Sequence, residues 1–365
     1  MILKDIIHFL EALAPKNYQE SYDNSGLICG DKNTLITKAI VCLDTIEEVV
    51  DEAISKKANL IIAHHPIVFK GLKSFTGKNY VERVIIKAIK NDIAIYAIHT
   101  NLDNVLDGVN AKICEKLGIK HPKILSPKSN TLNKLVFYTP SLDVKEVKDA
   151  LFAVGAGNIG NYSEASFDSK GTGTFKGNEH SKPTIGKKNI RENAEEVKSE
   201  MIFPKYLKNK IIATLIEKHP YEEVAYNIIS LENNNQDIGS GMIGFLEEEI
   251  NTTELFEKIK KEFNCKCIRH TKITKKKITK IAVCGGSGSF LLQDAIQQKA
   301  DIFITGDFKY HEFFDAENNI IIADIGHFES EQFTNELLLE KMTKKFPTFA
   351  TLLTEVNTNP VEYYT

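Results

Sequence analysis

Short apolar runs alternate along the first part of the chain with longer segments whose apolar residues recur at helical spacing. The predicted strands are 39–43, 60–63 and 93–98. The predicted helices are 47–57, 81–91 and 109–117. Strands that alternate with helices in this way are typical of a largely parallel sheet covered by helices. The pattern therefore predicts an α/β fold for this part of the chain.

The same alternation returns near the end of the chain. The predicted strands there are 278–283, 301–305 and 320–325, and the predicted helices are 289–299 and 331–345. The segment between the two parts has a different composition, with Gly-rich stretches and a Lys/Glu-rich segment. Within it, strand 134–138 and helices 144–154 and 204–218 belong to the order strand-helix-strand-strand-helix-strand, which resembles a ferredoxin-like module.

Three predicted strands run directly into residue types that bind metals. They are followed by His64 and His65, by His99 and Asp103, and by His327 and Glu331. Open α/β sheets place their chemistry at the carboxyl ends of strands, so these side chains are expected to meet. Mixed imidazole and carboxylate donors suit Zn, Mn, Fe or Ni better than Ca or Mg. The pattern predicts a divalent-metal site.

Because the two outer parts carry complementary donors, we expect them to form one discontinuous α/β domain, at 1–128 and 238–365. Residues 129–237 are then an inserted α+β domain. Such insertions are tolerated at surface loops, since the entropy of loop closure grows only slowly with length.

Local sequence supports convergence of the donors. Pro66 forces the chain out of a strand ladder directly after His64 and His65, so both rings can face one cleft. His327 and Glu331 are four residues apart at a helix start, which places them on one face. A lone histidine at a strand end is usually a hydrogen-bonded core or loop residue. Three clusters with matching donor chemistry favour a metal site instead, since buried polar groups are costly.

Two further segments are predicted near the same strand ends. Residues 284–289 (Cys-Gly-Gly-Ser-Gly-Ser) follow a strand and open a helix, so they form either a phosphate-binding turn or a purely structural one. Residues 306–311 include Asp307, Tyr310 and His311. Together with His99, these side chains are candidates for orienting the ligands or for carrying protons.

The composition limits which partners, cysteine chemistry and cellular location can be expected. The chain has 365 residues and a formal net charge of −3, which disfavours nucleic acid as the main partner. Its six cysteines contain no Cys-x-x-Cys pair, so neither a disulfide framework nor a thiolate zinc site follows. The N-terminus reads as an amphipathic helix rather than a signal peptide, and no apolar span reaches bilayer length. A cytoplasmic location without membrane contact is expected.

The motifs together resemble the Nif-three-like family, whose bacterial members carry the name GTP cyclohydrolase 1 type 2 homologue. The resemblance covers nearly the whole chain. It rests on S-Y-D-N-S-G-L (21–27), I-I-A-H-H-P (61–66), H-T-N-L-D (99–103), G-D-F-K-Y-H (306–311) and G-H-F-E-S-E (326–331). Tyr22 replaces the tryptophan usual in the first motif, a position outside the expected ligand set.

The resemblance implies a centre of two divalent metal ions per subunit, whose ligands are His64, His65, Asp103, His327 and Glu331. The insert is similar to the PII/CutA-like domain of long family members, through G-T-G-T-F (171–175) and H-P-Y-E-E-V-A-Y (219–226). The family also implies a toroidal homohexamer.

Three functions stay open. The first is a di-metal hydrolase in which metal-activated water attacks a nucleotide-like substrate, with GTP as the leading candidate and His99 or His311 as proton carriers. The second is a metal-stabilised hexameric scaffold or sensor that binds a small molecule or protein through its insert. The third is a metal-dependent phosphoesterase, which would need a positively lined channel for nucleic acid. Five donors shared by two ions leave positions for water, which favours catalysis over a closed structural site.

Overall fold

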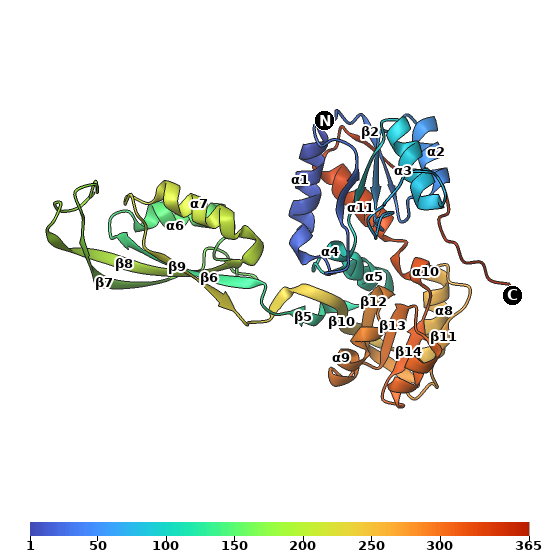
Figure 1. Ribbon diagram of the computed structural model, residues 1–365. Helices are drawn as coiled ribbons and strands as arrows, with labels where there is room; N and C mark the ends of the chain where they lie inside the picture. Colours follow the sequence, from blue (N-terminus) through green and yellow to red (C-terminus); the bar gives the residue numbers. More distant parts are fainter. Residues whose placement is uncertain (365) are drawn as a thin grey trace. The chain divides into compact units, whose positions relative to one another are not determined.

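The computed structural model describes residues 1–364 and separates into two compact units (Figure 1). The first unit combines Met1–Ser126 with the chain from Asp237 onward, and the second is Pro127–Gln236. Strands and helices alternate along both units, so the predicted mixed α/β class is confirmed.

The first unit contains a five-stranded sheet in the order β1-β4-β3-β2-β15. Its strands are β1 (Gly26–Cys29), β2 (Lys38–Cys42), β3 (Leu60–Ala63), β4 (Ala94–Ala97) and β15 (Ala350–Leu353). Strands β15, β2, β3 and β4 are parallel, whereas β1 pairs with β4 in the antiparallel sense. All four residues of β3 are buried, which explains why its sequence is apolar throughout rather than alternating.

Helices cover both faces of this sheet. Helices α2 (Glu47–Ser55) and α3 (Tyr80–Lys90) pack on one face through Val49, Val84 and their neighbours. Helix α1 (Leu3–Leu13) packs on the other face and lies on the opposite side of the sheet from α2 and α3 in Figure 1. Helix α3 begins one residue before its predicted start, because the side chain of Asn79 caps it by accepting a hydrogen bond from the backbone N–H of Glu82.

A second sheet of the same unit has the order β11-β14-β13-β12-β10-β5. Its strands are β5 (Lys120–Lys128), β10 (Asn235–Asn251), β11 (Arg269–His270), β12 (Lys277–Ser287), β13 (Ile302–Gly306) and β14 (Ile321–Asp324). The central strands β12, β13 and β14 are parallel. Helix α8 (Thr252–Glu262) and helix α9 (Leu292–Gln297), which follows a 3-10 turn at Ser289–Leu291, pack against this part.

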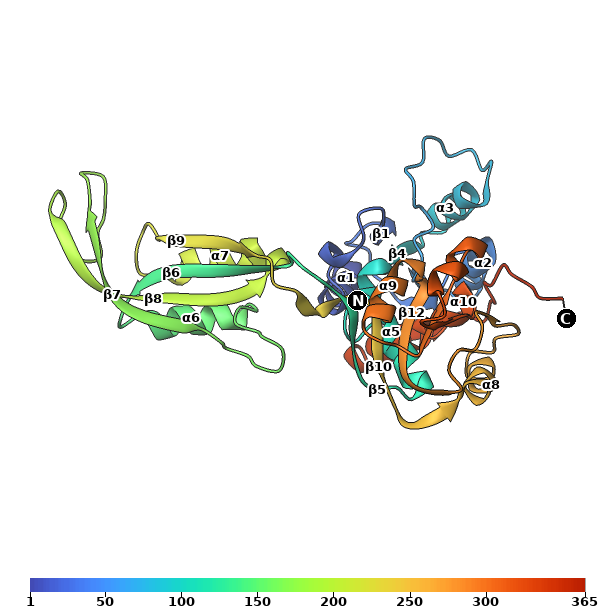
Figure 2. The ribbon, with the colours of Figure 1, turned by 90° about the horizontal axis from the view of Figure 1, so that it is seen from below.

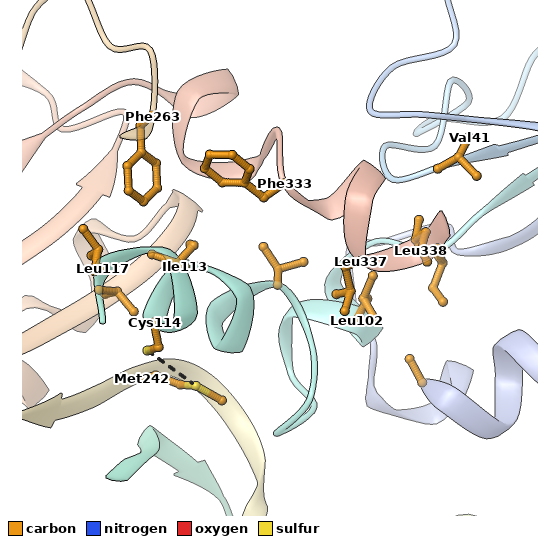
Figure 3. Packing of buried hydrophobic residues seen from close by; sticks show 14 of the residues in the cluster. Val41, Leu102, Ile113, Cys114, Leu117, Met242, Phe263, Phe333, Leu337 and Leu338 are labelled. Carbon is orange, nitrogen blue, oxygen red and sulfur yellow. Dashed lines mark hydrogen bonds between the residues drawn. The ribbon is translucent and has the colours of Figure 1, made fainter. Parts of the chain in front are cut away.

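One hydrophobic core joins the two sheets. Besides α1 and α8, its helices are α4 (Thr100–Asp103), α5 (Val109–Leu117) and α11 (Thr334–Lys345). The short helix α10 (His327–Glu331) contacts β12 and α5. Helix α5 lies against β12 (Figure 2), and α11 contacts both α5 and β15. Figure 3 shows how Val41 of β2, Leu338 of α11 and Ile113 of α5 belong to the same cluster of buried side chains. The sheets are therefore fixed relative to each other by shared packing.

The second unit follows the order β6 (Leu132–Pro140), α6 (Val144–Ala153), β7 (Phe167–Lys176), β8 (Arg191–Pro204), α7 (Lys208–Lys218) and β9 (Tyr226–Leu231). Its strands form an antiparallel sheet in the order β7-β8-β6-β9. This is the strand-helix-strand-strand-helix-strand order of a ferredoxin-like fold. Leu135 and Phe137 of the sheet and Leu151 and Ile211 of the helices form its separate core.

Candidate metal centre

The carboxyl ends of the parallel strands in both sheets face one cavity of about 780 Å³ in the first unit. Four of the five predicted ligands line it: His65, Asp103, His327 and Glu331. His64, the fifth, is fully buried beside them. Residues more than 260 positions apart in the sequence are thus neighbours in space, as the strand-end argument predicted.

The carboxylate of Glu331 lies between the histidines. Its Oε2 is 2.9 Å from Nε2 of His65 and 3.0 Å from Nε2 of His327, while its Oε1 is 3.9 Å from Nε2 of His64. Asp103 Oδ1 lies 3.6 Å from Nε2 of His64. Three imidazoles therefore direct the same ring atom, Nε2, towards two carboxylates.

The other nitrogen of each ring is held by an oxygen. Nδ1 of His64 is 2.8 Å from the backbone oxygen of Ile98, and Nδ1 of His65 is 2.7 Å from Asp44 Oδ1. Nδ1 of His327 is 2.6 Å from Asp307 Oδ2. Since these oxygens only accept hydrogen bonds, each Nδ1 carries the proton and donates it. This leaves Nε2 as the atom that can bind a metal.

Two buried polar atoms of the site lack a hydrogen-bond partner among residues 1–364. They are Nε2 of His64 and Oδ1 of Asp103. A buried donor or acceptor without a partner is costly, and a cation between these atoms would satisfy both. Three groups have ligand atoms within 4.8 Å of one another: His64, Asp103 and Glu331; His65, His327 and Glu331; and His64, His65 and His99. This donor set fits divalent ions that accept nitrogen and oxygen together.

The electrostatics of the cavity favour positive charge. Burial opposes protonation of His65, but hydrogen bonds to Asp44 and Glu331 raise its pKa to about 10. Burial likewise opposes protonation of His327, but the charge of Glu331 and the hydrogen bond to Asp307 raise its pKa to about 11. Burial and the charge of Glu331 raise the pKa of Asp103 to about 7. The cavity therefore holds protons in the absence of a cation, and a divalent ion would compete for the same donors.

His99, predicted as an orienting group or proton carrier, also lines the cavity. Its ring centroid lies 5.3 Å from that of His64 and 5.2 Å from that of His65. Nδ1 of His99 is 2.8 Å from Asp23 Oδ1, and Asp23 also accepts hydrogen bonds from Thr100. Burial raises the pKa of Asp23, but the hydrogen bonds and charge of His99 outweigh it and hold that pKa well below its usual range.

The remaining predicted residues are placed differently. Asp307 lines the cavity and orients His327, whereas His311 and Tyr310 are exposed and are not among the described residues that line it. Gly285 and Ser287 of the Gly-rich turn line the cavity as well. A Cβ added to Gly286 would come within 2.3 Å of Glu331 Oε1, so this turn packs closely against the ligand.

Sequence reasoning missed Asp44, which holds His65, and Asp23, which holds His99. Asp44 lies two residues after the end of the buried strand β2, so the same strand-end rule could have found it. It also missed the aromatic side chains of the cavity rim. Tyr22, Phe69, Tyr80 and Phe290 line the cavity and are each at least half exposed.

The fold and the site define a mixed α/β protein with a candidate metal centre between two sheets. The sequence profile of the Duf34/NIF3 family (NGG1p interacting factor 3) matches residues 1–360. A relative from Halalkalibacterium halodurans named GTP cyclohydrolase 1 type 2 homolog is 40% identical over 341 residues, covering 93% of this chain and 91% of the relative. A Bacillus subtilis protein of the same name is 36% identical over 367 residues, covering 99% and 98%.

The crystal structure of a Bacillus cereus protein related to NIF3 matches with a TM-score of 0.86 at 37% identity, covering 100% of this chain and 99% of that one. The chain therefore belongs to the Duf34/NIF3 family, which confirms the resemblance inferred from its motifs. Within residues 1–364 no helix has the length and apolar character needed to cross a membrane.

Proposed function

We propose that this protein is a metal-dependent hydrolase that holds two divalent ions and acts on a nucleotide-like substrate, with GTP as the first candidate. The observation that carries the proposal is the pair of buried, unpartnered atoms, His64 Nε2 and Asp103 Oδ1, beside Glu331. A purely structural cluster would be expected to satisfy its own buried atoms.

The ligands in this proposal are His64, His65, Asp103, His327 and Glu331. Divalent ions in such a site supply Lewis-acid activation of water and of the substrate's electrophilic atom. Glu331 would be the ligand shared by both ions, because its two oxygens approach different histidines.

His99 is the chain's own candidate for proton transfer. Asp23 accepts a hydrogen bond from its Nδ1, which leaves Nε2 able to take a proton at the cavity. The roles of Asp23 and His99 therefore match those of an orienting carboxylate and a base. His311 is exposed and is not among the residues that line the cavity, so it is the weaker candidate.

The cavity rim supports a substrate with a planar ring and negative charge. Exposed aromatic side chains, among them Tyr22, Phe69 and Phe290, offer faces on which a heteroaromatic ring can stack. Arg269 also lines the cavity, and its side chain is 55% exposed although it pairs with Asp324. Its remaining N–H groups can meet a phosphate. The name of the relatives, GTP cyclohydrolase 1 type 2 homolog, points to the same substrate class.

The test is a turnover assay on metal-loaded protein. Wild-type protein, a His65→Ala variant and a His8→Ala variant are incubated with a panel of nucleotides, and products are identified by mass spectrometry. His8 is an exposed histidine of α1, so its variant controls for the loss of an imidazole outside the cavity. We expect turnover of at least one nucleotide by wild type and His8→Ala only. If no nucleotide is converted faster than by His65→Ala, the proposal is wrong and the scaffold or sensor function is favoured.

A further inference from the structure

The segment after β15, residues 354–364, lies along the wall of the metal cavity. Its cavity-lining residues are Thr358, Asn359, Pro360, Val361 and Tyr363. This segment contains no regular secondary structure, so its position depends on side-chain contacts. None of these residues carries a motif that sequence reasoning singled out.

Thr358 connects this segment to a predicted ligand through one carboxylate. Its Oγ1 donates to Asp44 Oδ2 at 2.8 Å, and Asp44 Oδ1 accepts from Nδ1 of His65 at 2.7 Å. Thr358 is only 8% exposed. The two oxygens of Asp44 are thus divided between the C-terminal segment and the histidine.

Further contacts hold the segment at its start and in its middle. The backbone N–H of Glu355 donates to Glu52 Oε1 of α2 at 2.9 Å, and the hydroxyl of Thr354 donates to Glu52 Oε2. Asn359 Nδ2 donates to Glu329 Oε1 at 3.3 Å, in the short helix that carries His327 and Glu331. The segment therefore reaches from the first sheet to the helix that supplies the ligands of the second.

We infer that Thr358 is a positioning residue of the metal centre, which acts through Asp44 to fix the ring of His65. The terminal torsion of an aspartate is broad, so a carboxylate held at one oxygen alone can rotate. The hydrogen bond from Thr358 removes that freedom and keeps Oδ1 directed at Nδ1 of His65. Partners that orient metal-bound histidines in this way typically change metal affinity about 10- to 100-fold when removed. The inference rests on the metal-binding part of the proposed function.

The test uses Co²⁺ as the probe metal. Apparent affinity is measured by competition with a chelator, and the visible absorption spectrum of the Co²⁺ protein reports ligand geometry. Thr358→Val removes the hydroxyl at nearly constant shape, and Thr358→Ser restores it. Thr351→Val is the matched control, because the buried hydroxyl of Thr351 in β15 makes no hydrogen bond within the described chain.

We expect Thr358→Val to weaken Co²⁺ binding about 10-fold and to alter the spectrum. Thr358→Ser and Thr351→Val should match wild type, and the melting temperatures of the metal-free proteins should be similar. If Thr358→Val binds Co²⁺ with wild-type affinity and spectrum, the inference is overturned while the metal proposal stands. Failure of Thr358→Ser to restore binding also overturns it. If wild type binds no Co²⁺, the metal-binding proposal itself fails.

Discussion

The two sheets contribute to the candidate metal centre in different ways. His64 and His65 come directly from the end of a buried strand, and His64 is anchored to the backbone oxygen of Ile98. His327 comes from a five-residue helix, and its side chain is 39% exposed and anchored to the half-exposed carboxylate of Asp307. The first sheet thus supplies a buried donor, His64, that is held by the backbone, whereas the second supplies a donor, His327, whose position depends on a side chain and on tight turns.

The tight turns of the second sheet explain why its donors approach so closely. Gly326 precedes His327 with a φ of +97°, and a Cβ at Gly306 would come within 2.8 Å of the backbone N of His327. Only a residue without Cβ permits this approach at low cost. The positions of the donors after the first sheet therefore follow from the order of its strands, whereas those after the second sheet also need glycines in tight turns.

Glu331→Gln should have the largest effect on metal binding. Its carboxylate lies close to the histidines of both halves of the site, which are His64 and His65 after the first sheet and His327 after the second. We expect loss of stoichiometric metal after dialysis against chelator, a larger effect than the about 10- to 100-fold typical of residues that only orient ligands. Metal content by mass spectrometry checks the result. Retention of two ions per subunit would show that metal binding does not need the Glu331 carboxylate between the histidines of the two sheets.

Metal affinity should rise with pH. Without a cation His65 and His327 have raised pKa values of about 10 and about 11, so both are protonated at neutral pH. A metal must displace these protons, and affinity then changes roughly tenfold per pH unit for each proton released. Calorimetry in two buffers with different ionisation enthalpies counts the protons. At pH 8, where Asp103 with its pKa of about 7 is largely ionised, we expect about two protons for wild type, one each from His65 and His327, and about one fewer for His327→Ala.

Gly286→Ala should damage the second half selectively. The new Cβ would lie 2.3 Å from Glu331 Oε1, at a backbone φ of +61° that costs about 1–2 kcal/mol for a residue other than glycine. Gly71→Ala, in the loop after β3, is the control, since no described atom lies within 4 Å of its added Cβ. Equal metal affinity and melting temperature for the two variants would contradict the dependence of this half on a close turn.

Asp307→Asn should have the smallest effect on metal binding. Asp307 orients His327 through Nδ1 at 2.6 Å, but it is half exposed, and exposed charge pairs contribute little. We expect a loss near the lower end of the range for orienting residues, about 10-fold. The same competition assay measures it, with Asp44→Asn in the first half for comparison. A larger loss of metal affinity for Asp307→Asn than for Asp44→Asn would contradict the expectation that the exposed Asp307 contributes less than Asp44.

Much of the fold was predictable because its central strands are buried on both faces. Strands β3, β4 and β14 are buried throughout and carry no charged residue except Asp324 at the end of β14, and the residues that follow them carry the donors. Strand β15 was missed because it pairs with β2, more than 300 residues earlier, and nothing local indicates that partner. Helix α8 was also missed, since only Thr252, Leu255 and Ile259 of its residues are buried.

The predicted ligands were brought together, but the residues that orient them were found only in part. Asp307 was a candidate from its motif, whereas Asp44 was missed because no histidine stands beside it at the end of its strand. Thr358 carries no sequence signal, because its role depends on a hydrogen bond to a residue 314 positions away. Long-range contacts of single side chains are what the sequence pattern leaves undetermined.

The wide separation of His65 and Glu331 in the chain, 266 residues, has a consequence for biosynthesis. A polypeptide leaves the ribosome from its N-terminus, so His64 and His65 emerge long before their partners exist. During translation the nascent protein can offer only an incomplete set of donors. Tight capture of an ion at this site would therefore have to wait until Glu331 has also left the ribosome.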